Sequence, residues 1–159
     1  MTSHLPAPLQ IRELFGDLLG REVTLSPSAP LAPGPAMPAT IASYVDDVLQ
    51  LRALVVCDLP LSAYAGAAIG LVPQGQAEDA ITDGALTDPL AENLYEVLNI
   101  AASLFNVDGA AHVKLHAMAP AGGPMDPQLM ARALTLGRRE DLAVSINGYG
   151  DGRLSIVLV

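Results

Sequence analysis

The sequence has few of the residues that form cross-links or large aromatic clusters. Cys57 is the only cysteine among 159 residues, tryptophan is absent, and aromatic residues make up 4% of the chain. A single cysteine excludes a disulfide within the chain. Cys57 lies in the apolar run 54–57, which predicts a buried structural thiol. Because aromatic residues are so few, the core must be built from aliphatic side chains and methionine.

Basic residues are also scarce. Eight lysines and arginines stand against 17 acidic residues, which gives a net charge of −9. Nucleic-acid backbones and anionic lipid surfaces bind clustered basic side chains, but the one adjacent pair, Arg138 and Arg139, is followed directly by Glu140. We therefore expect neither a nucleic-acid partner nor a membrane partner.

A long, unbroken apolar run is missing as well. The longest apolar stretch covers residues 51–72. Arg52 breaks it near its start, and Asp58 and Pro60 break it again, so it predicts a strand followed by a helix and not a membrane span. The first residues lack the basic segment and apolar block of a secretory signal. Together with the single cysteine, these features favour a cytoplasmic protein.

Aliphatic residues are abundant, and hydrophobic residues make up 51% of the chain. A length of 159 residues predicts a single domain, 1–159. A domain of this size buries about 70% of the surface that the unfolded chain exposes. The apolar excess also favours a self-association interface, so a homodimer is expected.

Periodicity and turn residues predict an α+β fold. Helices are expected at 9–19, 62–71, 86–106 and 126–136, and strands at 22–25, 40–44, 49–57, 111–118, 142–146 and 154–158. Residues 26–38 contain five prolines and several alanines, which predicts an extended loop without a core of its own, and 72–83 is interpreted as a polar connection. Because the strands fall in hairpins, we expect a mostly antiparallel sheet with the long helix and the shorter helices packed on it.

The long helix carries the most informative pattern. Its apolar positions form one core-facing sector: Leu94, Val97, Leu98, Ala101, Leu104 and Phe105. A polar stripe lies on the opposite side, with residues spaced four, three, four and three apart: Glu92, Glu96, Asn99, Ser103 and Asn106. A solvated face would explain the stripe. However, asparagine is a poor helix former, and the stripe lacks the basic partners that usually accompany acidic residues on such a face.

This stripe contains a known signature. Glu96-Val97-Leu98-Asn99, followed by Pro120, resembles the E-x-x-N…P motif of the CheC/CheX/FliY phosphatases of bacterial chemotaxis. The predicted element order is also similar to that family over residues 40–159. Only one E-x-x-N copy is present, which is closer to CheX than to the two-site CheC. The resemblance implies a CheX/CheC-like fold and hydrolysis of the aspartyl phosphate of a response regulator.

The resemblance implies roles for two residues of the stripe, and the other three are expected to contact the partner. Glu96 would engage a lysine of a phosphorylated CheY-type receiver domain, and Asn99 would orient the attacking water. Glu92 takes the place of the aspartate or serine usual in the family, and it would contact the partner together with Ser103 and Asn106. The Mg²⁺ ion would belong to the partner, so this chain is expected to hold no metal or other cofactor.

Two alternatives stay open. The first is a non-catalytic binding module of the same fold, such as a flagellar-switch or signalling adaptor domain. The second is an unrelated small-ligand domain, which a deep apolar pocket away from the stripe would favour. Exposure of Glu96 and Asn99 on an uncovered helix face would favour the phosphatase, whereas burial by a neighbouring element would oppose it.

Three other polar clusters have simpler interpretations. His112 and His116 would share one face of a strand roughly 13 Å apart, too far to ligate one ion. The glycine-rich residues 148–152 lie between two strands and predict a turn, because a phosphate-binding loop would lead into a helix. Asp46 and Asp47 are adjacent and predict a turn between two strands.

Overall fold

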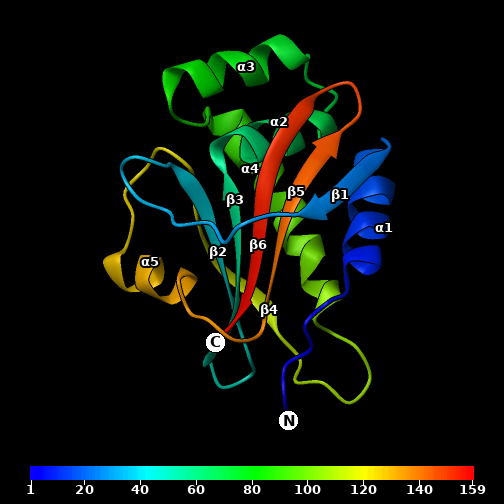
Figure 1. The fold of residues 1–159 in the computed structure, drawn as a ribbon, viewed down its shortest axis with the longest axis vertical. Helices are drawn as coiled ribbons and strands as arrows, with labels where there is room; N and C mark the ends of the chain where they lie inside the picture. Colours follow the sequence, from blue (N-terminus) through cyan, green and yellow to red (C-terminus); the bar gives the residue numbers. More distant parts are fainter.

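Six strands form one antiparallel sheet in the computed structural model, which describes all of residues 1–159 (Figure 1). In chain order they are β1 (Val23–Pro27), β2 (Ala39–Val45), β3 (Leu51–Asp58), β4 (Lys114–Ala119), β5 (Arg139–Ile146) and β6 (Gly150–Leu158). Across the sheet the order is β1-β5-β6-β3-β2-β4, and every pairing is antiparallel. The predicted α+β class is confirmed.

The helices lie mainly on one side of this sheet (Figure 1). They are α1 (Pro8–Leu19), α2 (Leu59–Ile69), α3 (Gln74–Asp83), α4 (Asp88–Ile100), the short 3-10 helix η1 (Ala101–Leu104) and α5 (Pro127–Ala133). Asp58 caps α2, because its carboxylate accepts a hydrogen bond from the amide of Leu61 at 2.9 Å. Thr87 caps α4 in the same way through the amide of Leu90 at 3.4 Å.

Each face of the sheet has its own core. On one face, 31 buried residues join the sheet to α1, α2 and α4. On the other face a smaller core contains Leu31, Ala39, Ile41, Leu54, Val56, Ala133 and Val157. The helix-covered face therefore holds most of the buried apolar surface, and α4 belongs to it.

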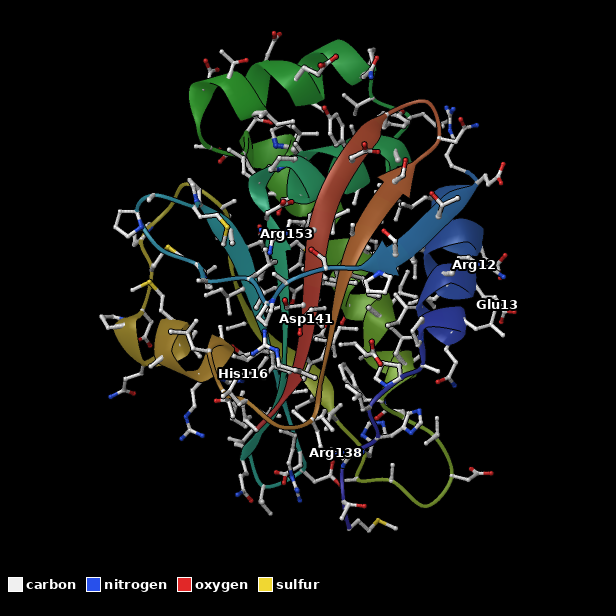
Figure 2. All side chains as sticks on the ribbon, viewed as in Figure 1. Arg12, Glu13, His116, Arg138, Asp141 and Arg153 are labelled. Carbon is white, nitrogen blue, oxygen red and sulfur yellow. The ribbon has the colours of Figure 1, made fainter.

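The proline-rich segment 26–38 packs on the sheet and contributes Leu31 to the smaller core. Leu31 is 1% exposed, and its amide donates a hydrogen bond to the Ser155 hydroxyl at 3.1 Å. Arg153 donates hydrogen bonds to Ser28 and to the carbonyl oxygen of Ala29. Figure 2 shows Arg153 on the side of the sheet that this segment crosses. Leu31 of segment 26–38 is buried because it packs against the sheet.

Helix α3 corrects the prediction of an irregular connection at 72–83. It begins after Pro73 and ends at Gly84, whose φ of 81° is a left-handed conformation that suits glycine. Its only buried residues are Ala77 and Ala80, and it packs against α2 at the end of the molecule drawn at the top of Figure 1. Because only two residues of α3 are buried, most of its sequence is polar and resembles that of a loop.

Several element boundaries differ from the prediction by a few residues, and two of the differences lie near the polar stripe. The α-helix expected at 86–106 ends at Ile100 and tightens into the 3-10 turn η1, as helix ends commonly do. The strand expected at 111–118 starts only at Lys114. His112 therefore lies outside β4, while His116 lies at a register shift between β2 and β4, so the two histidines do not share a strand face.

Close packing against α2 fixes the position of α4. A Cβ atom on Gly66 would lie 2.6 Å from the carbonyl oxygen of Leu90, so only glycine allows this approach. The side-chain amide of Asn93 donates a hydrogen bond to the Gly66 carbonyl at 3.0 Å. Most residues of α2 are buried, so α4 packs against a helix that belongs to the core. None of the helices combines the length and the apolar character needed to cross a bilayer.

Candidate functional site

Helix α4 has one buried face and one exposed face. Leu90, Leu94, Val97 and Leu98 are buried in the larger core. Glu92, Glu96 and Asn99 are exposed on the other side. The side chains of this segment that form hydrogen bonds belong to Thr87, Asn93 and Asn106. The side chains of Glu96 and Asn99 form none, so both are available to a partner.

The end of α4 that carries Asn99 is held from the sheet. Tyr44 of β2 donates a hydrogen bond from its hydroxyl group to the carbonyl oxygen of Leu98. Its ring packs against Phe105 at 5.2 Å between centroids. Burial, followed by the nearby Cys57, raises the pKa of Tyr44 far above its ordinary value. The hydroxyl therefore stays protonated and acts as a donor at every physiological pH.

Ser103 and Asn106 lie beyond the α-helical part of the predicted stripe. Ser103 is exposed in η1. The Asn106 amide nitrogen donates to the carbonyl oxygen of Val113 at 2.9 Å, and its oxygen accepts from the Val113 amide at 2.8 Å. This pair of bonds closes the connection between η1 and β4. The helical part of the stripe therefore consists of Glu92, Glu96 and Asn99.

The segment of the chain that carries the site is acidic. Residues 53–111, which include α2, α3 and α4, contain no lysine, arginine or histidine. The same segment has eight acidic residues: Asp58, Glu78, Asp79, Asp83, Asp88, Glu92, Glu96 and Asp108. A region with this charge attracts basic protein surfaces and repels acidic ones.

The chain offers no grouping of three or more histidine, cysteine, aspartate or glutamate side chains that could hold a metal ion. The Nδ1 atom of His112 lies 4.0 Å from a carboxylate oxygen of Asp47, and both side chains are largely exposed. Asp46 accepts hydrogen bonds from the amides of Val48 and Gln50 and forms an ion pair with Arg52 at 2.9 Å. Asp46 thus organises the β2–β3 turn, as its position in the sequence indicates.

Sequence reasoning missed a second feature beside the stripe. A hollow of about 300 Å³ is lined by Ala91, Glu92, Tyr95 and Met118. Tyr95 is 43% exposed, although an aromatic ring on a core helix usually faces inward. The exposed position of Tyr95 follows from its place on the helix, but its proximity to Met118 depends on how β4 packs beside α4.

Comparisons with known proteins identify the fold. No protein-family model and no curated protein matches the sequence. The FliM middle domain from H. pylori has a TM-score of 0.59 at 6% identity, over 94% of this chain and 83% of that chain. A chain of the FliM–SpeE complex from H. pylori gives a TM-score of 0.57 at 8% identity, over 94% of this chain and 82% of that chain.

A CheX–CheY–BeF₃–Mg²⁺ complex from Borrelia burgdorferi gives a TM-score of 0.49 at 9% identity, over 92% of this chain and 90% of that chain. A TM-score below 0.5 does not establish a shared fold, so the fold assignment rests on the two FliM structures. The chain has the fold of the FliM middle domain. At 6–8% identity the likeness concerns the fold alone.

Proposed function

We propose that this chain is a CheX-like phosphatase that hydrolyses the aspartyl phosphate of a CheY-type receiver domain in cytoplasmic two-component or chemotaxis signalling. One observation carries the proposal. Glu96 and Asn99, the two residues of the E-x-x-N motif, project from an uncovered helix face and form no hydrogen bond within the chain.

The form of the site suits a protein substrate. The hollow beside the motif is lined by Ala91, Glu92, Tyr95 and Met118 and includes neither Glu96 nor Asn99. They project outward from α4, which favours insertion into the active site of another protein over capture of a small molecule. The acidic surroundings add attraction for a basic partner surface.

Each residue has a role that its chemistry allows. The Glu96 carboxylate pairs with a lysine of the receiver and fixes the orientation of the two proteins. The Asn99 amide has both donor and acceptor atoms, so it can hold a water molecule in line with the phosphorus atom. Water then adds to phosphorus, the bond to the aspartate oxygen breaks, and inorganic phosphate leaves. The Mg²⁺ ion of the receiver balances the charge on the phosphoryl group.

The test is release of phosphate from a phosphorylated receiver domain encoded beside this protein. Asn99→Ala should lower kcat by about 100-fold, because a mispositioned nucleophile costs a factor of this order. The matched control is Gln76→Ala, which removes an exposed carboxamide from α3 and should leave kcat unchanged.

The same experiment separates the alternative. Equal rates for the wild-type chain and Asn99→Ala would overturn the catalytic role of Asn99. If the wild-type chain binds the receiver but releases no phosphate above the receiver's own rate, the chain is a non-catalytic binding module of the same fold.

A further inference from the structure

The hollow beside the E-x-x-N motif lies between a helix and the open edge of the sheet. Ala91, Glu92 and Tyr95 line it from α4, and Met118 lines it from β4. β4 is the last strand of the sheet, with β2 on one side and no strand on the other. The hollow is therefore open to an approaching protein.

The side chains around the hollow are of the kind that anchors protein interfaces. Tyr95 is 43% exposed, and an aromatic ring supplies a large contact area at little cost in conformational entropy. Met118 is half-buried and packs against the larger core beneath it. Its thioether adapts to the shape of whatever contacts it. A space of this size can take up an apolar side chain of a partner.

The hollow and the motif form one continuous surface. Tyr95 and Asn99 are one helical turn apart, and so are Glu92 and Glu96, so these four side chains are neighbours on the surface of α4. A protein that brings its phosphorylation site to Asn99 therefore also covers Tyr95. The hollow is part of the area that docking would bury.

The negative charge at the rim of the hollow indicates which partner side chains would occupy it. Glu92 supplies a carboxylate at the rim, and the whole segment 53–111 contains no basic residue to pair with it. A partner with an acidic side chain at this point would be repelled. The complementary surface is an apolar side chain next to a lysine or an arginine.

We propose that this hollow is a specificity contact for the receiver domain. It takes up one apolar side chain of the receiver, and Glu92 pairs with a basic side chain beside it. The proposal rests on the proposed function for the identity of the partner. It adds that Tyr95 and Glu92 select among receivers, whereas Glu96 and Asn99 act at the phosphoryl group.

The experiment measures binding and turnover separately. The probe is the receiver domain held in its active form by beryllofluoride and Mg²⁺, and its Kd is measured by calorimetric titration. KM and kcat come from phosphate release by the phosphorylated receiver. The variants are Tyr95→Ala, Tyr95→Phe and Glu92→Lys, with Leu136→Ala as the control, because Leu136 is an 81% exposed apolar residue outside the hollow.

Tyr95→Ala should raise both Kd and KM by about 10-fold or more, as loss of an interface anchor does, and leave kcat unchanged. Tyr95→Phe keeps the ring and should bind like the wild-type chain. Glu92→Lys should weaken binding, and added salt should reduce the difference from the wild-type chain. Leu136→Ala should change none of these constants.

Three results would overturn the proposal, and they can be told apart. If Tyr95→Ala keeps the wild-type Kd and KM while Asn99→Ala loses turnover, the hollow is no contact but the phosphatase stands. If the wild-type chain does not bind the receiver, the proposed function fails together with the docking surface. If Tyr95→Ala instead dissociates a dimer in light scattering and leaves receiver binding unchanged, a second copy of this chain occupies the hollow.

Discussion

The hydroxyl group of Tyr44 donates a hydrogen bond to the carbonyl oxygen of Leu98, the residue that precedes Asn99. Tyr44 is fully buried in β2, an inner strand of the sheet, whereas Asn99 is exposed to solvent. A residue of the core therefore holds the helical turn that presents the proposed water-positioning group. This hydrogen bond links the stability of the core to the position of Asn99, the proposed catalytic residue. It gives the first prediction.

Tyr44→Phe should lower the free energy of unfolding by about 1–3 kcal/mol, because a buried carbonyl loses its partner. It should also lower kcat, since the turn that carries Asn99 gains freedom. Urea denaturation and phosphate release measure the two effects. Tyr95→Phe removes an exposed hydroxyl from the same helix and should change neither quantity. Wild-type stability in Tyr44→Phe would show that this bond does not hold the turn.

Asn106 should act on stability and not on partner binding. Its amide makes two hydrogen bonds to the backbone of Val113, so Asn106→Ala should lower the free energy of unfolding by about 1–2 kcal/mol. Ser103→Ala, three residues earlier, should leave the thermal midpoint unchanged. If Asn106→Ala weakens receiver binding at unchanged stability, Asn106 contacts the partner directly.

Gly66 should tolerate no side chain. A Cβ atom there would lie 2.6 Å from the Leu90 carbonyl oxygen, so Gly66→Ala must push α4 away from α2 and should destabilise the fold by about 1–3 kcal/mol. In Gly16→Ala, the corresponding contact is an ordinary 3.5 Å to the carbonyl oxygen of Arg21. That change in α1 should stabilise by about 0.5–1 kcal/mol through helix propensity. Thermal unfolding of both variants compares them, and equal midpoints would contradict the close approach.

Asp46 should make stability depend on pH in the acid range. The hydrogen bonds from the Gln50 amide and the Arg52 side chain lower the pKa of Asp46 below its ordinary 3.8. A carboxyl group whose pKa is lower in the folded state stabilises the fold above its unfolded pKa. That contribution is lost as the pH falls through the folded pKa.

The stability difference between the wild-type chain and Asp46→Asn should therefore be constant at neutral pH and shrink below about pH 3.8. Burial raises the pKa of Asp58, which acts in the opposite sense. Asp58 is present in both proteins, so its effect cancels in the difference. Urea denaturation at a series of pH values measures that difference, and a gap that stays constant down to pH 2 would contradict the prediction.

Local sequence signals predicted most of the fold. The strands of both hairpins follow from β-rich runs on either side of turn residues, and Pro60 marks the start of α2. Helix α3 could not be predicted in this way, because only Ala77 and Ala80 are buried, and two apolar positions are too few to give a helical pattern. The prediction also missed the residue at which α4 ends. Tyr44 and Val113 form hydrogen bonds with this part of the chain, and such contacts leave no periodic pattern in the sequence.

For the site, the angular positions on one helix were enough to expect Glu96 and Asn99 opposite the core, where the structure places them. The hollow at Tyr95 needs a second element, because Met118 comes from β4 and its distance from α4 is set by the sheet. Homodimer formation and the catalytic role of the pair stay predictions.

The independence of Glu92, Glu96 and Asn99 from the rest of the chain has a consequence for how such a domain can change over generations. Because these exposed side chains form no hydrogen bond or ion pair within the chain, most substitutions other than proline at the three positions should leave the protein folded. Single substitutions could then abolish partner engagement, restore it or redirect it to another receiver without passing through an unfolded intermediate. The fold would stay the same while the partner that the domain engages changes.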